Sequence, residues 1–379
     1  MGTTSSPSVA ARKQQQLLLL RLAVLLLAGA ASGHAQKYNA VFNFGDSITD
    51  TGNLCTSGKP TAITFTQPPY GETYFGSPTC RCSDGRVIVD FLSTKFGVPF
   101  LAPSKSSNGT DFKQGANMAI TGATAMDAPF FRGLGLSDKI WNNGPISLQI
   151  QWFQQITSTV CGDAAACKRY LRDSLVVFGE FGGNDYNAML FGNYSAGQAS
   201  RYTTKIVNTI IRGVEKVVGM GARDVVVPGV LPIGCFPIYL TVYGTNSSAD
   251  YDTLGCLRKF NDLSTFHNNL LQAKIARLRK RYGRAARVMY ADFYSAVYDM
   301  VQNPSKYGFN AVFEACCGSG GGKYNYANSA RCGMQGAAAC ASPADHLSWD
   351  GIHLTEAAYK HITDGWLNGP YCSPAILHS

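Results

Sequence analysis

The stretch VFNFGDSITDTGN, residues 41–53, joins an apolar run to a turn that contains glycine, aspartate and serine. The apolar part predicts a buried β-strand that ends at Phe44. A turn directly after such a strand places polar side chains at the carboxyl edge of a sheet, where open α/β folds bind their ligands. By turn propensity alone Ser47 is an ordinary turn residue. Its role therefore depends on what the rest of the chain supplies.

Further short apolar runs predict more strands of the same sheet. They are SLVVFG (174–179), RDVVVPG (223–229) and RVMYADF (287–293), and their continuous β-branched character suits a parallel sheet that is buried on both faces. Apolar residues at helical spacing predict amphipathic helices over 203–219 and 260–281. Because strands and helices alternate along the chain, an α/β sandwich is predicted rather than an all-α or all-β fold.

The N-terminal segment predicts export of the protein. Residues 1–35 contain basic residues, then a leucine-rich run at 17–31, then a stretch of small residues, which is the layout of a secretory signal peptide cleaved after Ala35. A retained membrane anchor is the alternative interpretation. Residues 36–379 show no internal repeat and no long linker, so they are predicted to form a single domain.

Cysteine usage agrees with an exported protein. All 12 cysteines follow the predicted cleavage point, and an even number in a secreted chain predicts disulfides. Proximity in the sequence favours the pairs Cys161–Cys167 and Cys235–Cys256. The glycine-rich segment 316–333 is the most irregular part of the chain and is predicted to be a disulfide-pinned surface loop. Its glycine and lysine positions do not fit a phosphate-binding loop. No CxxC or HExxH motif occurs, so no metal site is predicted.

Three glycosylation triplets support the same compartment. They begin at Asn108, Asn193 and Asn246. The apoplast with its cell wall and the Golgi lumen both fit a protein on the secretory route. The formal charge of +9 is modest, and the densest basic segment, 274–287, alternates with apolar residues at helical spacing. That pattern predicts a solvated helix face and not a nucleic-acid site.

A catalytic serine would need a base and a group that orients the base. Of the six histidines, His353 is the best candidate, because Asp350 precedes it by three positions in the segment SWDGIHLTEAAYKHI. So short a loop lets the carboxylate reach one imidazole nitrogen while the other faces Ser47. Thr355 is placed to cap a following helix. His346 is a weaker candidate, because the aspartate beside it in sequence would point away.

Two further segments offer donors for an oxyanion. GGNDY (182–186) directly follows a predicted strand, so the side-chain amide of Asn184 would lie at the same sheet edge as Ser47. NMAITGATA (117–125) contains Gly122, whose backbone N–H can approach a ligand closely because glycine lacks a Cβ.

Taken together, the four segments resemble the plant GDSL esterase/lipase family of the SGNH hydrolase superfamily. FGDSITDTGN, NMAITGATA, GGNDY and DGIHLTEAAY occur in the family's order and span nearly the whole chain after the signal. The resemblance implies a three-layer α/β/α sandwich with a central parallel sheet, similar to flavodoxin. It implies the following roles: Ser47 as nucleophile, His353 as general base, Asp350 as its orienting carboxylate, and an oxyanion hole from the backbone N–H groups of Ser47 and Gly122 and the side chain of Asn184.

This resemblance also implies the reaction. It is ester hydrolysis through an acyl-enzyme, with no metal or organic cofactor, on a small-molecule or polysaccharide ester. The segment 68–92 is similar to the branch that acts on acylated natural products and cell-wall acetyl esters, which favours removal of acetyl groups from O-acetylated polysaccharides or glycosides. A lipase for longer acyl chains is one alternative. The other is a catalytically silent secreted module that binds carbohydrate or protein.

Overall fold

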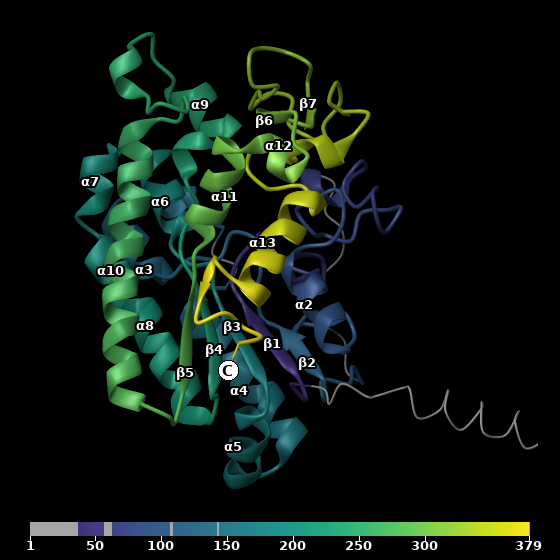
Figure 1. Ribbon diagram of the computed structural model, residues 1–379, viewed down its shortest axis with the longest axis vertical. Helices are drawn as coiled ribbons and strands as arrows, with labels where there is room; N and C mark the ends of the chain where they lie inside the picture. The colour runs from purple at the N-terminus through teal and green to yellow at the C-terminus, as the bar shows by residue number, and fades with distance from the viewer. Residues whose placement is uncertain (1–36, 57–62, 107–108, 142–143, 379) are drawn as a thin grey trace, which may run out of the picture. The chain divides into compact units, whose positions relative to one another are not determined.

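A six-stranded β-sheet forms the centre of the protein in the computed structural model, which describes residues 37–56, 63–106, 109–141 and 144–378 (Figure 1). The strands run in the spatial order β10-β5-β4-β3-β1-β2, and every neighbouring pair is parallel except β10 with β5. They comprise β1 (Val41–Phe44), β2 (Gly115–Asn117), β3 (Leu175–Phe178), β4 (Asp224–Pro228), β5 (Arg287–Ala291) and β10 (Cys372–Ser373). The predicted central parallel sheet is therefore confirmed.

Helices cover both faces of the sheet and complete the predicted three-layer sandwich (Figure 1). On one face α8 packs against α4 and α10, and α5 packs against α4; on the other face α13 packs against α2 and α11. The bounds of these helices are α2 (Ile88–Phe96), α4 (Ile146–Cys161), α5 (Ala164–Arg172), α8 (Thr203–Met220), α10 (Arg258–Tyr282), α11 (Phe293–Gln302) and α13 (Glu356–Asn368). Shorter helices lie in the connections: α3 (Ala128–Gly133), α6 (Gly183–Leu190), α7 (Ala196–Ser200), α9 (Pro237–Tyr243) and α12 (Pro304–Tyr307).

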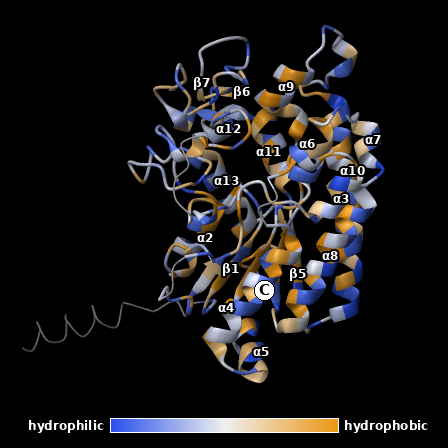
Figure 2. Ribbon diagram, turned by 180° about the vertical axis from the view of Figure 1, so that it is seen from behind, coloured by the Kyte–Doolittle hydropathy of each residue, from blue (hydrophilic) through white to orange (hydrophobic). Residues whose placement is uncertain are grey.

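Hydropathy explains why these segments take their places. The central strands are apolar and buried, whereas the long helices carry both hydrophobic and hydrophilic residues, as Figure 2 shows. Predicted helices 203–219 and 260–281 are confirmed as α8 and α10. Thr355 caps α13 as predicted, since its hydroxyl accepts a hydrogen bond from the backbone N–H of Ala358.

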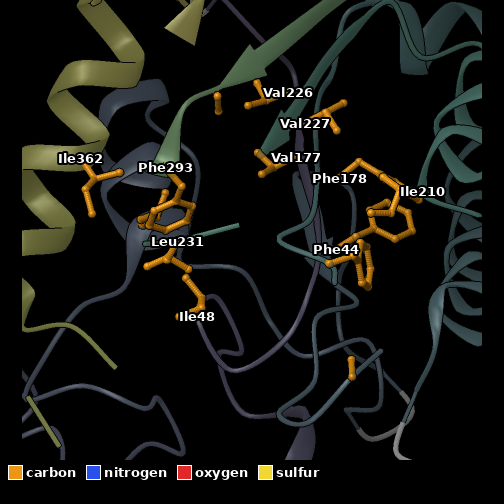
Figure 3. Close-up of a cluster of buried hydrophobic side chains, with 14 of the residues drawn as sticks. Phe44, Ile48, Val177, Phe178, Ile210, Val226, Val227, Leu231, Phe293 and Ile362 are labelled. Atoms are coloured by element: carbon orange, nitrogen blue, oxygen red, sulfur yellow. The ribbon is translucent and has the colours of Figure 1, made fainter. Parts of the chain in front are cut away.

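The core lies on both faces of the sheet. Figure 3 shows Ile210 of α8 beside Phe178 on one side of the strands, and Ile362 of α13 beside Phe293 on the other. The ring centroids of Phe44 and Phe178 lie 4.9 Å apart, and Phe44 directly precedes the turn that begins at Gly45. Burying one such side chain stabilises the fold by about 1.5 to 3 kcal/mol, so the end of β1 that carries this turn is firmly packed.

Disulfides hold the less regular C-terminal region. There β6 (Ala311–Ala315) pairs with β9 (His346–Ser348), and β7 (Cys317–Gly318) pairs with β8 (Ala338–Ala339). The bonds Cys316–Cys340 and Cys317–Cys332 fasten the glycine-rich segment, which confirms the predicted disulfide-pinned loop.

The cysteines in the rest of the described chain form three more disulfides and two free thiols. The predicted pairs Cys161–Cys167 and Cys235–Cys256 are confirmed. Cys55 pairs with Cys80, and Cys82 and Cys372 are buried free thiols.

Several predictions concern the route of the protein to the cell exterior. The predicted signal peptide at 1–35, the alternative of a retained anchor, and the triplet at Asn108 lie outside the described residues. Asn193 and Asn246 are exposed, as glycosylation at these positions would require. Among the helices that the structure describes, none is long and apolar enough to cross a membrane.

Candidate active site

Ser47 lies in the turn that follows β1, at the carboxyl edge of the sheet. The turn begins at Gly45, which has a φ of +140°, and a Cβ there would lie 2.8 Å from the backbone oxygen of Gly179. Gln149 of α4 forms two hydrogen bonds with the same glycine. Its Nε2 donates to the Gly45 carbonyl at 2.8 Å, and its Oε1 accepts from the Gly45 N–H at 3.0 Å. Ser47 is thereby held in a fixed position, only 7% exposed.

His353 joins Ser47 to Asp350 by two hydrogen bonds. Its Nε2 lies 2.9 Å from the Ser47 Oγ, and its Nδ1 lies 2.7 Å from the Asp350 Oδ2. Because the ionised carboxylate only accepts, the imidazole proton resides on Nδ1. Nε2 is then free to accept the proton of the serine hydroxyl.

The loop between β9 and α13 orients the Asp350 carboxylate. Its Oδ1 accepts from the backbone N–H groups of Ile352 at 2.9 Å and His353 at 2.7 Å. Its Oδ2 accepts from the Tyr70 hydroxyl at 2.7 Å as well as from the His353 ring. Each carboxylate oxygen therefore has two donors, which fixes the plane of the group.

Electrostatics favour an ionised Asp350 and a basic His353. Burial works to raise the pKa of Asp350, but His353 and the surrounding donors outweigh it and hold that pKa at about 2. Burial works to lower the pKa of His353, yet the charge and hydrogen bond of Asp350, with the charge of Asp46, raise it above its ordinary value. A raised pKa makes the imidazole a stronger proton acceptor for Ser47.

Backbone donors lie next to this set. Among the residues that the structure describes, no acceptor hydrogen-bonds to the backbone N–H of Ser47 or Gly122, and both residues line the same cavity. Gly122 has a φ of +81°, and a Cβ on it would lie 2.8 Å from the Cβ of Trp141. Only glycine fits beneath that tryptophan. The two unpaired N–H groups are suited to bind an oxyanion.

Asn184, at the start of α6, lines the cavity with a side chain that is already engaged. Its Nδ2 donates to the Asp46 Oδ2 at 2.6 Å and to the Ala123 carbonyl at 3.0 Å. Asp46 also accepts from the backbone N–H of Ile48. Burial raises the pKa of Asp46 to about 6. Asn184 therefore links the turn of Ser47 to the segment that contains Gly122.

Buried carboxylates fasten the separate segments of the site to one another. Asp50 accepts from both the backbone N–H and the hydroxyl of Thr121, the residue before Gly122. Asp185 accepts from the backbone N–H groups of Ala125 and Met126, and burial raises its pKa to about 7. These contacts set the spacing between groups that are far apart in sequence.

A cavity of about 540 Å³ opens over the site. All five predicted residues, Ser47, Gly122, Asn184, Asp350 and His353, line it. One part of its wall is apolar and aromatic, and another combines rings with polar side chains. The apolar part consists of Phe191, Leu231, Ile233, Phe236, Ile238 and Tyr239, and the mixed part includes Thr64, Phe65, Thr124, Trp141, Tyr326 and Asn328.

The alternative base lies elsewhere. The Nδ1 of His346 lies near the Cys340 Sγ and the Ser342 carbonyl, and His346 does not line the cavity. In the described part of the chain, Cys316, Cys340 and His346 are the one group of potential metal ligands that lie close together. The two cysteines form a disulfide, so they offer no thiolate to a metal.

Sequence reasoning missed the supporting residues Tyr70 and Gln149. Each acts through one long-range contact, across 280 and 104 residues respectively, and such a contact leaves no periodic signal. The only trace of Tyr70 was its position in the PPYGETYFG segment, whose similarity to one branch of the resembled family carried no role for the tyrosine.

Comparison with known proteins identifies the relatives of this chain. The sequence profile of the GDSL-like Lipase/Acylhydrolase family matches residues 41–366. A GDSL esterase/lipase of Arabidopsis thaliana is 41% identical over 344 residues, which cover 89% of this chain and 92% of the relative. The sinapine esterase of Brassica napus is 41% identical over 347 residues, covering 90% and 88%. A second GDSL esterase/lipase of Arabidopsis thaliana is 40% identical over 347 residues, covering 91% and 85%.

Proposed function

Since this chain belongs to the GDSL-like lipase/acylhydrolase family and is a serine hydrolase of the carboxylesterase type, we propose that Ser47 is its nucleophile, His353 its general base and Asp350 the carboxylate that orients the base. The observation that supports this assignment best is the continuous pair of hydrogen bonds from Ser47 through His353 to Asp350, of 2.9 and 2.7 Å. A catalytically silent binding module would have no need of this geometry.

The reaction follows from the chemistry of these groups. Ser47 Oγ attacks the ester carbonyl carbon while His353 Nε2 takes the hydroxyl proton. The tetrahedral intermediate expels the alcohol, which receives that proton from His353. Water then attacks the acyl-enzyme with His353 again as base, and the carboxylic acid leaves as Ser47 regains its proton.

The oxyanion of the intermediate is bound by the N–H groups of Ser47 and Gly122, with Asn184 as a third donor. Asn184 donates to Ala123 at 3.0 Å and to Asp46 at 2.6 Å. The longer bond, to the neutral carbonyl, is the one that Asn184 shares with or releases to the oxyanion. Its shorter bond to Asp46 keeps the amide aimed at the turn of Ser47.

Replacing Asn184 with alanine is expected to lower kcat by about a hundredfold to a thousandfold, as the loss of one preorganised oxyanion donor does in comparable enzymes. The KM should change little, because the ground-state ester carries no oxyanion. Steady-state kinetics on a p-nitrophenyl ester measure both constants. Asn368→Ala, on the exposed end of α13, is the matched control and should keep wild-type kinetics. An Asn184→Ala enzyme with wild-type kcat would exclude Asn184 from the oxyanion hole.

For the substrate, we infer removal of acetyl groups from O-acetylated glycosides or cell-wall polysaccharides. The cavity of about 540 Å³ is far larger than an acetyl group, so most of the bound substrate would be the alcohol part. Rings such as those of Trp141 and Tyr326 can stack on the apolar faces of a sugar, and Asn328 and Thr124 can bind its hydroxyls. Trp141 is 47% exposed, as a surface for stacking requires.

A second candidate is a lipase for longer acyl chains. The apolar and aromatic residues that line the cavity, among them Phe191 and Ile238, favour it, because such side chains can bury an alkyl chain. The name of the Brassica relative adds sinapine as a third substrate to test.

A substrate panel separates these candidates. We expect the highest kcat/KM on acetyl esters, with acetate released from acetylated xylan or acetylated glycosides, and falling rates from p-nitrophenyl acetate to butyrate to palmitate. Acetate is measured enzymatically and p-nitrophenol by absorbance, with sinapine hydrolysis followed in parallel. A preference for palmitate would favour the lipase, and a preference for sinapine would direct the assignment towards the activity of that relative.

The compartment belongs to the same proposal. We infer that the protein is exported to the apoplast or retained in the Golgi lumen. The five disulfides among the described residues support an oxidising environment.

A further inference from the structure

We propose that Tyr70 is a positioning residue of the active site, which acts by donating its phenol hydrogen bond to the carboxylate of Asp350. It extends the row Ser47–His353–Asp350 by a fourth side chain. This inference rests on the proposed function, since it assigns Tyr70 a role in the chemistry proposed for those three residues.

The contact is short, buried and specific. The Tyr70 hydroxyl lies 2.7 Å from the Asp350 Oδ2, the same oxygen that accepts the His353 Nδ1–H at 2.7 Å. Tyr70 is 2% exposed and Asp350 is 6% exposed, so the bond is largely shielded from bulk solvent. The two other donors to Asp350 are backbone N–H groups from its own loop. Among the described residues, Tyr70 is thus the one side chain from a distant segment that is bonded to the carboxylate.

A dedicated cluster holds the Tyr70 ring in place. Its centroid lies 5.9 Å from that of Trp349 and 6.3 Å from that of Phe65, both in edge-on packing. Trp349 directly precedes Asp350, so the ring and the hydroxyl of Tyr70 contact neighbouring residues of one loop. The cluster also includes Cys82 and the disulfide-bonded cysteines Cys316, Cys317 and Cys332. The pinned glycine-rich loop therefore forms one side of the tyrosine's site.

The phenol has two consequences for His353. It helps to fix the carboxylate plane, because without it Oδ2 would have the imidazole of His353 as its one donor among the described residues. Its hydrogen bond also stabilises the negative charge on Oδ2 and so weakens the attraction between that charge and the protonated imidazole. Without the phenol, Asp350 would stabilise protonated His353 more strongly. The pKa of His353 would then rise, and the imidazole would become protonated at a higher pH.

Other titratable groups lie near Asp350 and His353. They are Asp46 from the turn after β1, Cys82 from the segment before α2, Tyr326 from the glycine-rich loop, and Tyr359 from α13. Burial raises the pKa of Cys82 well above its ordinary value, and that of Tyr326 to about 12, so both remain neutral near pH 7. Asp46 is present in every variant below, so comparison between the variants isolates the effect of the hydroxyl at position 70.

Tyr70→Phe tests the proposal, because it removes the hydroxyl and retains the ring. In the wild type, kcat/KM falls as the pH drops through the pKa of His353. We expect the variant to lose about tenfold to a hundredfold in kcat/KM, and its acid limb to move to higher pH by about half a unit to one unit. The pH profile is measured on p-nitrophenyl acetate, and thermal unfolding verifies that the variant is folded.

Tyr298→Phe is the matched control. Tyr298 lies on α11 and does not line the cavity, and its hydroxyl donates to the Asp252 Oδ2 at 3.0 Å, so it is a tyrosine–aspartate pair away from Asp350. Its acid limb should coincide with that of the wild type. If Tyr70→Phe also leaves the acid limb in place, or if both variants shift it equally, the positioning role of Tyr70 is refuted.

A second substitution keeps the test decisive if Tyr70→Phe does not fold. Incorporation of 3-fluorotyrosine at position 70 makes the phenol a stronger donor, so the acid limb should move to lower pH, opposite to the phenylalanine variant. No shift, or an upward shift, contradicts the proposal. The proposed function is tested separately, by the activity and probe labelling of Ser47→Ala and the wild type, which do not depend on the result at position 70.

Discussion

Replacing Ser47 with alanine is expected to lower kcat by about 10⁵- to 10⁶-fold, the loss that follows removal of the nucleophile in serine hydrolases. The physical reason is that the hydroxyl 2.9 Å from His353 Nε2 is the only atom there that can form the acyl-enzyme. Water and the two backbone donors would still give a small residual rate. Hydrolysis of p-nitrophenyl acetate measures the loss, and a fluorophosphonate probe should label the wild type and not the variant.

Ser93→Ala is the control for this experiment. Ser93 is a buried serine on α2 whose hydroxyl has no hydrogen-bond partner in the described part of the chain, so its loss should leave rate and labelling unchanged. Equal labelling of Ser47→Ala and the wild type would move the nucleophile to another residue. A folded wild type that neither reacts with the probe nor hydrolyses any ester would favour the catalytically silent binding module instead.

The sequence allowed much of the fold to be predicted, because continuous apolar runs mark strands buried on both faces. Segments 174–179 and 223–229 became β3 and β4 for this reason. The edge strands β2 and β10 were missed, since neither is long enough to show a pattern. Gly115 of β2 has a φ of +125° and lies so close to β1 that a Cβ would clash with the Val41 carbonyl. Gly115 is therefore required by the close approach of the two backbones, and glycine gives no sequence signal for a strand.

For the site, the sequence predicts the residues that belong to short local motifs, and it does not predict the residues that act through long-range contacts. Asp350 and His353 are three positions apart, so their pairing is visible as a short motif. Tyr70 and Gln149 contribute through contacts across the fold, and no spacing rule reports such a contact. The engagement of Asn184 by Asp46 was equally invisible, because it depends on how two loops pack.

Replacing Asp350 with asparagine is expected to lower kcat by about 10⁴-fold. The carboxylate accepts from two backbone N–H groups on Oδ1, and from Tyr70 and His353 on Oδ2. An amide has one acceptor oxygen, and the fixed backbone donors of Ile352 and His353 require it on the Oδ1 side. The NH₂ group then faces the His353 Nδ1 and donates to it. The imidazole proton moves to Nε2, where it points at Ser47 and prevents His353 from acting as a base.

Asp350→Ala distinguishes this change of tautomer from simple loss of charge. Alanine also removes the charge but places no donor against Nδ1, so a fraction of His353 keeps the productive tautomer. We therefore expect the asparagine variant to be at least as impaired as the alanine variant, although asparagine is the closer match in shape. Kinetics on p-nitrophenyl acetate compare the two, with Asp364→Asn on the exposed face of α13 as the control for an aspartate change. If asparagine retains clearly more activity than alanine, Asp350 acts mainly through packing, and the hydrogen bond to Nδ1 does not set the tautomer of the base.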